Sequence, residues 1–259
     1  MQVQNFLLLP MALLLPPRAQ GGEIIGGRKA KPHSRPYMAY LERKLSNGKE
    51  QRCGGFLVRE DVVLTAAHCA AREITVVLGA HDISQEEETQ QRISVQQQIP
   101  HPDYDNKSFV NDLMLLQLEE PVELTDAVGT INLPRARQQV DPGSLCSVAG
   151  WGRTSLYKTT SILHEVELEV MSNKTCLADE FIQSRYKPSH MMCVGDPDEN
   201  KASFWGDSGG PLVCAGTAEG IVSFGKKNGS PPRVFTRIST YITWIKSKLR
   251  RLRRRGTAL

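Results

Sequence analysis

Residues 206–211 read Gly-Asp-Ser-Gly-Gly-Pro, and the serine within them, Ser208, is the most distinctive position of the chain. A serine that attacks a carbonyl group must expose its hydroxyl beside backbone N–H groups that can hold the oxyanion as it develops. Glycines on either side let the backbone turn tightly and approach a substrate closely. The stretch therefore predicts a nucleophilic serine.

Two positions upstream could supply the base and the group that orients it. His68 lies between small residues and Cys69, so its ring has room and the cysteine can staple the segment. Asp112 directly precedes an apolar run, so we expect a partly buried carboxylate that needs a partner such as a histidine N–H. Alone, a histidine is more often a surface or core residue without a catalytic role, and an Asn-Asp pair more often marks a turn. In the order His68, Asp112, Ser208, however, the three match one known order of a catalytic triad.

Short apolar runs separated by turn signals, such as residues 62–65, 74–78 and 113–118, predict an all-β barrel or sandwich. The polar, irregular residues 119–140 are the candidate crossing between two halves. One helix is expected at the C-terminus, with Ser239 as its N-cap. Its apolar stripe comprises Tyr241, Ile242, Ile245 and Leu249.

The N-terminus and the cysteines indicate a secreted protein. Residues 1–21 combine a leucine-rich run with small residues at the end, which is typical of a signal peptide, although a basic n-region is missing. Six cysteines behind such a signal imply disulfides, with about 15 possible connectivities. No C-x-x-C pair occurs, which argues against a zinc or redox site.

The net charge of +4 is concentrated at the C-terminus, where residues 246–255 read KSKLRRLRRR within a basic tail, 246–259. A basic surface of this kind fits a sulfated glycan. The alternative is a solvated helix end, where cations are favourable in any case. Aromatic residues do not interleave with the basic ones, which argues against nucleic-acid binding.

The chain resembles the chymotrypsin-like serine proteases over residues 24–249, and within them the granule proteases of immune cells: granzymes, cathepsin G and mast-cell chymase. The motifs that carry the resemblance are IIGG from Ile24, PHSRPYMAYL from Pro32, CGGFLVRE from Cys53, LTAAHC ending at Cys69, NDLMLLQL from Asn111, VAGWGR from Val148 and GDSGGPLVC from Gly206. The resemblance implies two six-stranded antiparallel barrels with the site between them, polypeptide substrates and no cofactor or metal. It also implies the disulfides Cys53–Cys69, Cys146–Cys214 and Cys176–Cys193.

The resemblance further implies how the site is built and switched on. The N–H groups of Gly206 and Ser208 would form the oxyanion hole, and an acyl-enzyme would form on Ser208. The new α-amino group of Ile24 would pair with the buried Asp207 once the dipeptide 22–23, Gly-Glu, is removed. A dipeptidyl peptidase is the implied activator, and storage in secretory granules is the implied location.

Substrate preference is expected to depend on a few pocket residues. By the resemblance, Ala202 lies at the pocket floor, where an Asp would select Lys or Arg. Ser223, Phe224 and Gly225 form the strand that pairs with the substrate backbone, and Arg233 falls where granzyme B also has arginine. A buried arginine favours a carboxylate, so cleavage is expected after Asp or Glu.

Two alternatives remain open for the function. If Arg233 turns away or pairs with an internal acid such as Glu219, the pocket would accept Phe, Tyr, Leu or Met. The chain could also be an inactive granule protein that binds glycans or membranes. The further bridge that many relatives have beside the pocket is absent: Phe204 takes one cysteine position, and residues 225–231 contain none.

Three surface features have weaker patterns. Asn106 and Asn173 lie in N-x-[ST] sequences and are candidate glycosylation sites. Asn228 also matches, but Pro231 directly follows its motif, which makes use of that site less favourable. The acidic run 86–88 is expected to be a solvated loop rather than a calcium site.

Overall fold

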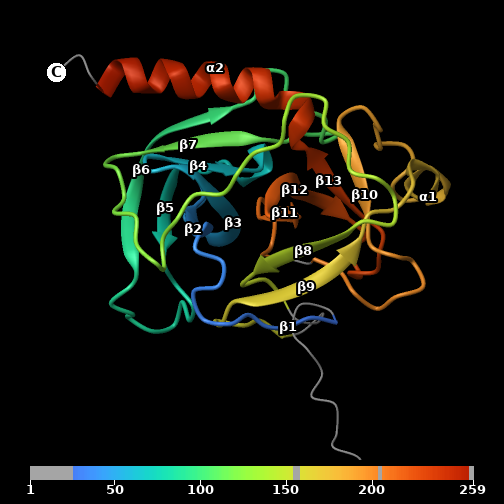
Figure 1. Ribbon diagram of the computed structural model, residues 1–259, viewed down its shortest axis with the longest axis horizontal. Helices are drawn as coiled ribbons and strands as arrows, with labels where there is room; N and C mark the ends of the chain where they lie inside the picture. The colour runs from blue at the N-terminus through green and yellow to red at the C-terminus, as the bar shows by residue number, and fades with distance from the viewer. Residues whose placement is uncertain (1–25, 154–157, 204–205, 257–259) are drawn as a thin grey trace, which may run out of the picture.

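The first half of the chain forms a closed six-stranded barrel with the strand order β2-β3-β4-β7-β6-β5 (Figure 1). The computed structural model describes residues 26–153, 158–203 and 206–256, with side chains as far as residue 252. The barrel strands are β2 (Met38–Lys44), β3 (Glu50–Arg59), β4 (Val62–Thr65), β5 (Glu73–Leu78), β6 (Gln91–Pro100) and β7 (Met114–Leu118). Inward residues such as Leu41, Phe56 and Leu64 are fully buried, and the apolar core that they form extends to Val213 and Ile221 of the second half.

The apolar runs in the sequence predicted the barrel strands β4, β5 and β7 but not β6. Its residues, QRISVQQQIP, are mostly polar and exposed, and they contain no apolar run. The strand forms because both edges are used: it pairs antiparallel with β5 and with β7. Residues 91–100 thus form a strand because their backbone groups pair on both sides. This pairing closes the barrel and removes its free edges.

The second half is a seven-stranded antiparallel sheet with the order β1-β9-β8-β11-β12-β13-β10. Its strands are β1 (Arg28–Lys29), β8 (Leu145–Gly150), β9 (His164–Glu169), β10 (Met191–Val194), β11 (Pro211–Cys214), β12 (Thr217–Gly225) and β13 (Arg233–Arg237). The end of β9 meets β10 through an isolated bridge, Val170 to Val194, and a 2.8 Å hydrogen bond from Gly195 N to Glu169 O. The all-β prediction is confirmed. The second half differs from the expected six-stranded barrel in two ways: its strand order does not close into a barrel in the described ranges, and it gains a seventh strand because β1 pairs with Glu165 and His164.

The chain passes from the barrel to the second sheet between Leu118, the last residue of β7, and Leu145, the first of β8. This connection includes the predicted crossing, residues 119–140. The one β-type backbone pairing of this connection is an isolated parallel bridge between Asn132 and Thr217. This connection therefore joins two halves that form separate sheets.

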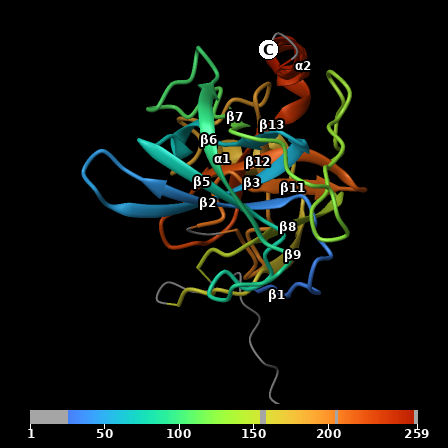
Figure 2. The ribbon, with the colours of Figure 1, turned by 90° about the vertical axis from the view of Figure 1, so that its left-hand side faces the viewer.

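The C-terminal helix α2 (Ile238–Gly256) packs along the barrel, and the view from the barrel side shows it end-on (Figure 2). The predicted apolar stripe is confirmed, since Tyr241, Ile242 and Ile245 are buried against the barrel core. The predicted N-cap is wrong. The helix begins at Ile238, one residue earlier, and the buried Ser239 hydroxyl has no hydrogen-bond partner among the described residues.

A short helix, α1 (Asn173–Ala178), was not predicted; it is held to β10 by the Cys176–Cys193 disulfide. Neither this helix nor any other helix in the described ranges is both long and apolar enough to cross a membrane.

Candidate active site

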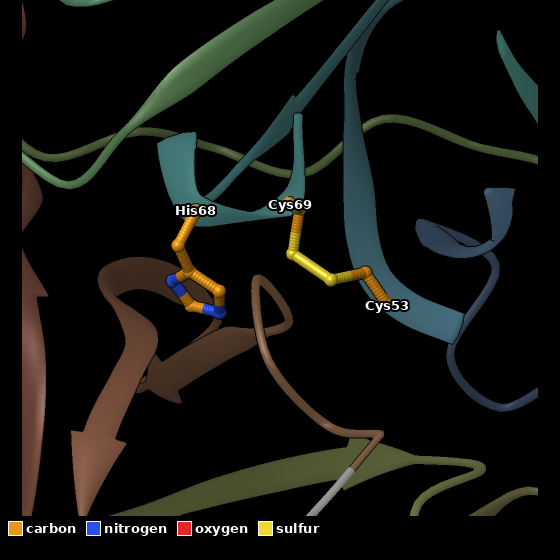
Figure 3. A group of neighbouring side chains, drawn as sticks. All are labelled: Cys53, His68 and Cys69. Atoms are coloured by element: carbon orange, nitrogen blue, oxygen red, sulfur yellow. A yellow bond between two sulfur atoms is a disulfide. The ribbon is translucent and has the colours of Figure 1, made fainter. Parts of the chain in front are cut away.

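His68 lies on a 3₁₀ turn (Ala67–Cys69) directly after β4, and a disulfide holds that turn to β3 (Figure 3). The Cys53–Cys69 bond brings the sulfurs close to the His68 ring, and the three potential ligand atoms lie within 4.8 Å of one another. Both sulfurs are bonded to each other, so neither is a thiolate that could ligate a metal. The disulfide in Figure 3 therefore fixes the turn that contains His68.

Asp112 meets His68 at two points. Its Oδ2 accepts a hydrogen bond from His68 Nδ1 at 2.7 Å, and its Oδ1 accepts one from the His68 backbone N–H at 2.9 Å. Ser223 donates its hydroxyl to the same Oδ2 at 2.5 Å. The carboxylate is 0% exposed. With both oxygens used, Asp112 fixes the orientation of the imidazole and leaves Nε2 as the ring nitrogen available for chemistry.

Residues 206–210 form a tight loop that presents Ser208 to the barrel. Gly206 and Gly209 have φ values of 103° and 84°, which side chains rarely adopt. A Cβ on Gly209 would lie 2.1 Å from Thr65 Oγ1, so this glycine is also required by the close approach of the loop to β4. The Ser208 carbonyl accepts a 2.8 Å hydrogen bond from Gly54 N, next to Cys53 in β3.

Ser208 and His68 are therefore held to the same point of the barrel. Gly54 binds the serine backbone, and its neighbour Cys53 is bonded to Cys69, which follows His68. The hydrogen bonds of the described residues include none between the His68 ring and the Ser208 hydroxyl. In enzymes without substrate such bonds are often long and tighten only in the reactive complex.

Asp207 is buried in a niche made by glycines. Gly152 N donates to Asp207 Oδ1 at 3.0 Å, and a Cβ on Gly150 or Gly152 would lie 2.2 or 2.4 Å from that same oxygen. A buried carboxylate of this kind needs a cation to offset its desolvation. Ile24, the expected partner, lies outside the described residues.

Four of the expected pocket residues lie on the paired strands β12 and β13: Ser223, Phe224, Gly225 and Arg233. Ala202 is fully buried, Phe224 is buried, and Gly225 faces Arg233 across the two strands. Arg233 is 8% exposed, and its Nη1 donates to Lys226 O at 2.7 Å. Burial lowers the pKa of Arg233 to about 10, against the attraction of Asp207, so it stays a cation at neutral pH.

Glu219 is not the acid that acts on Arg233. It accepts a 2.5 Å hydrogen bond from Gln138, and burial raises its pKa while Arg237 opposes that rise.

One residue near the site was missed by the sequence reasoning. Phe109 has a positive φ of 60°, and its ring lies 5.9 Å from the His68 ring and 5.2 Å from the Phe224 ring. It therefore links the histidine to the strand expected to bind substrate. Its spacing of three residues before Asp112 is the only hint in the sequence, and that is not specific.

The three disulfides join the cysteines in the pairs that the resemblance implies.

The remaining expectations concern the surface. Asn106 and Asn173 are exposed, and Asn173 Oδ1 accepts a 2.6 Å hydrogen bond from Tyr186. In the acidic run 86–88, Glu86 and Glu88 are exposed as expected, but Glu87 turns inward and accepts from the backbone N–H groups of His81 and Asp82 at 2.7 and 3.2 Å.

A closed β-barrel and a second sheet that bring a buried aspartate, a histidine and a glycine-flanked serine to their junction define the chymotrypsin-like class of serine endopeptidases. Comparison with known proteins agrees with this class. The family model described as Trypsin matches residues 24–245. The chain belongs to this family of serine proteases.

Its relatives are of the granule type. It is 52% identical to "Granzyme B" of Homo sapiens, over 95% of this chain and 98% of that protein. It is 52% identical to "Cathepsin G" of Homo sapiens, over 94% of each. The solved structure described as "Structure of GrC" superposes with a TM-score of 0.84 at 50% identity, covering 88% of this chain and 100% of that one. The chain is a serine endopeptidase of the granzyme type.

Proposed function

We propose that His68, Asp112 and Ser208 are the catalytic triad of this endopeptidase. The observation that carries the proposal is the two-point contact of Asp112 with His68, through the ring Nδ1 at 2.7 Å and the backbone N–H at 2.9 Å. It selects the tautomer in which Nε2 has a free lone pair, as a general base requires.

In the first step, Ser208 Oγ attacks the carbonyl carbon of the scissile peptide bond while Nε2 of His68 takes the hydroxyl proton. The N–H groups of Gly206 and Ser208 stabilise the oxyanion; losing one such donor costs roughly 3–4 kcal/mol. The imidazolium then protonates the leaving amine, the C–N bond breaks, and the acyl group stays on Ser208. Water, deprotonated by His68, hydrolyses that ester and restores the enzyme.

A fluorophosphonate probe tests this assignment on a chain that begins at Ile24. We expect covalent labelling at Ser208, found by mass spectrometry of the labelled peptide. The matched control is Ser203→Ala, which alters a buried serine close in sequence and should leave labelling intact. Failure of the Ile24-started protein to label at Ser208 would remove the triad assignment.

Activation is proposed to follow the exposure of Ile24. Once a dipeptidyl peptidase removes Gly22 and Glu23, the new amine would pair with Asp207, whose niche is formed by Gly150 and Gly152. The support is the burial of Asp207, because a cation offsets the desolvation of a buried carboxylate.

Cleavage is proposed to occur after Asp, with Glu as a second choice. The support is Arg233: a buried cation on β13 that lies against Gly225 of the expected substrate strand. A guanidinium recognises a carboxylate by charge and by paired hydrogen bonds, so the pocket would prefer an acidic side chain over an aromatic one.

A sulfated glycan is proposed as a second partner, at the outer face of α2. Lys246, Arg250 and Arg251 are exposed on the helix, whose opposite face packs on the barrel. Because Lys246 and Arg250 are four residues apart in the helix, these two cations lie on the same face of it. Changing Lys246 and Arg250 to Gln should lower the salt concentration that elutes the protein from immobilised heparin; the same change at Lys49 and Lys227, exposed lysines elsewhere, should not. Equal elution of both variants with the parent would exclude the helix as the glycan site.

The protein is proposed to be secreted after removal of residues 1–21 and stored in granules, with Asn106 and Asn173 as glycan acceptors. The exposure of both asparagines supports the last point.

A further inference from the structure

Arg43 is a buried cation at an inward position of the barrel. Along β2, the inward residues Ala39 and Leu41 are fully buried apolar side chains, and Arg43 is the next in that row, at 7% exposed. Burial lowers the pKa of its guanidinium. Among the described residues no carboxylate forms an ion pair with it. Replacing a buried charged residue with an apolar one of similar volume often leaves the stability of a protein unchanged or raises it. The stability of the barrel therefore does not explain an arginine at this position.

The contacts of the guanidinium lead to the histidine turn. Nη2 donates to Gln51 Oε1 at 2.9 Å, and Nη1 donates to the backbone carbonyl of His68 at 3.3 Å. The strand register explains this reach. Arg43 pairs with Gln51, and the next inward pair is Leu41 with Cys53, whose disulfide holds the residue after His68.

Other hydrogen bonds hold the turn and the residues after it at different atoms. Asp112 Oδ1 holds the His68 N–H, and the Gln98 amide binds both the N–H and the carbonyl of Ala71, at 3.1 and 2.8 Å. The His68 carbonyl lies in a 3₁₀ turn of three residues, too short to satisfy it by continuing the helix. Arginine is a suitable donor for a carbonyl at such an end.

We propose that Arg43 is a positioning residue for His68. Asp112 accepts a hydrogen bond from the backbone N–H of His68, and Arg43 donates one to the backbone carbonyl of His68. Together they fix the direction in which the imidazole leaves the backbone, and hence the approach of Nε2 to Ser208. This proposal rests on the proposed catalytic role of His68.

The test is the kinetics of Arg43→Met on a peptide amide substrate, with rates divided by the number of serines that a fluorophosphonate titrates. We expect kcat to fall about tenfold while KM stays within about twofold, because small displacements of a catalytic group cost rate rather than substrate binding. Arg43→Lys, which retains a cationic donor without the fork, should recover part of kcat.

Arg59→Met is the matched control. Arg59 is a second barrel arginine, half-buried where Arg43 is buried, and it too binds a backbone carbonyl, Leu249 O at 2.6 Å. This carbonyl belongs to α2, on the outside of the barrel. Its loss should lower the Tm without lowering kcat. Equal kcat losses in the two variants, or wild-type kcat in Arg43→Met, would overturn the proposal.

Gln51→Met separates a failure to fold from a failure of the proposal. Should Arg43→Met not fold, Gln51→Met removes only the acceptor at Nη2; a smaller loss of kcat supports the proposal, and wild-type kcat overturns it. If instead the parent protein fails to label with the fluorophosphonate, the proposed triad fails before any variant at residue 43 is made.

Discussion

Replacing Asp112 with asparagine is expected to lower kcat about 10⁴-fold, the cost of holding the histidine of such a triad in the wrong tautomer. The hydrogen bonds at Asp112 explain why the wrong tautomer is chosen. Oδ1 accepts from the His68 backbone N–H, which cannot change its polarity, whereas Oδ2 accepts from ring Nδ1, which can. In the variant, the side-chain oxygen of the introduced amide would therefore face the backbone, and its NH₂ group would face the ring.

That NH₂ group requires a lone pair on Nδ1, so the proton moves to Nε2 and points at the Ser208 hydroxyl. The base is lost although no heavy atom need move. Ser223 must also turn its hydroxyl away from the new amide donor.

The measurement is the steady-state rate of the Asp112→Asn protein, with Asp105→Asn as control. Asp105 is exposed in the same segment and accepts from Ser108 and Lys107, so its loss should leave kcat unchanged. An Asp112→Asn enzyme within tenfold of the parent would mean that Asp112 does not set the tautomer.

The parts of the site that the sequence predicted are those with a local cause. Gly206 and Gly209 adopt positive φ values, so the loop around Ser208 could be recognised from its own residues. Asp112 precedes an apolar strand, and its burial follows from that neighbour. The cysteine pairs could be assigned only through the family resemblance, because spacing alone does not choose among connectivities.

The parts that could not be predicted depend on the register between strands. In the sequence of β2, MAYLERK, the arginine is typical of an exposed strand end; it is buried because β3 places Gln51 opposite it and Cys53 one inward step away. Phe109 is likewise typical of a loop aromatic, and it reaches His68 and Phe224 only because the loop before β7 folds across to the second sheet. The polar strand β6 forms because it pairs with β5 and β7, and its own side-chain pattern does not predict it.

The second large effect is expected from Arg233→Gly, which should lower kcat/KM for a substrate with Asp at the cleavage site at least about 10²-fold. Removing one partner of a buried charge pair costs roughly 3–5 kcal/mol, which corresponds to a loss of this size or larger. Internal hydrogen bonds restrain Arg233. Its Nη1 is held by Lys226 O, and Lys226 is in turn bonded to Asp179 at 2.9 Å, so the guanidinium cannot easily swing out of the pocket.

The glycine should also reverse the preference rather than abolish activity. The guanidinium now fills the space beside Gly225, where even a Cβ would lie 2.6 Å from Arg233 Cζ. Its removal would free that space, which in the proposed pocket is bounded by the apolar residues Ala202 and Phe224 and would suit Phe, Tyr, Leu or Met. A peptide library varied at the cleavage-site residue measures both changes at once.

Arg237→Gly separates this effect from the cost of a glycine in β13. Arg237 lies on the same strand, and its Nη2 donates to the backbone carbonyl of Met191 at 3.0 Å. Its replacement should lower the Tm while leaving the preference for Asp intact. If Arg233→Gly still cleaves after Asp with the efficiency of the parent, then the substrate carboxylate does not bind Arg233, and the chymotryptic interpretation of the pocket becomes the better one.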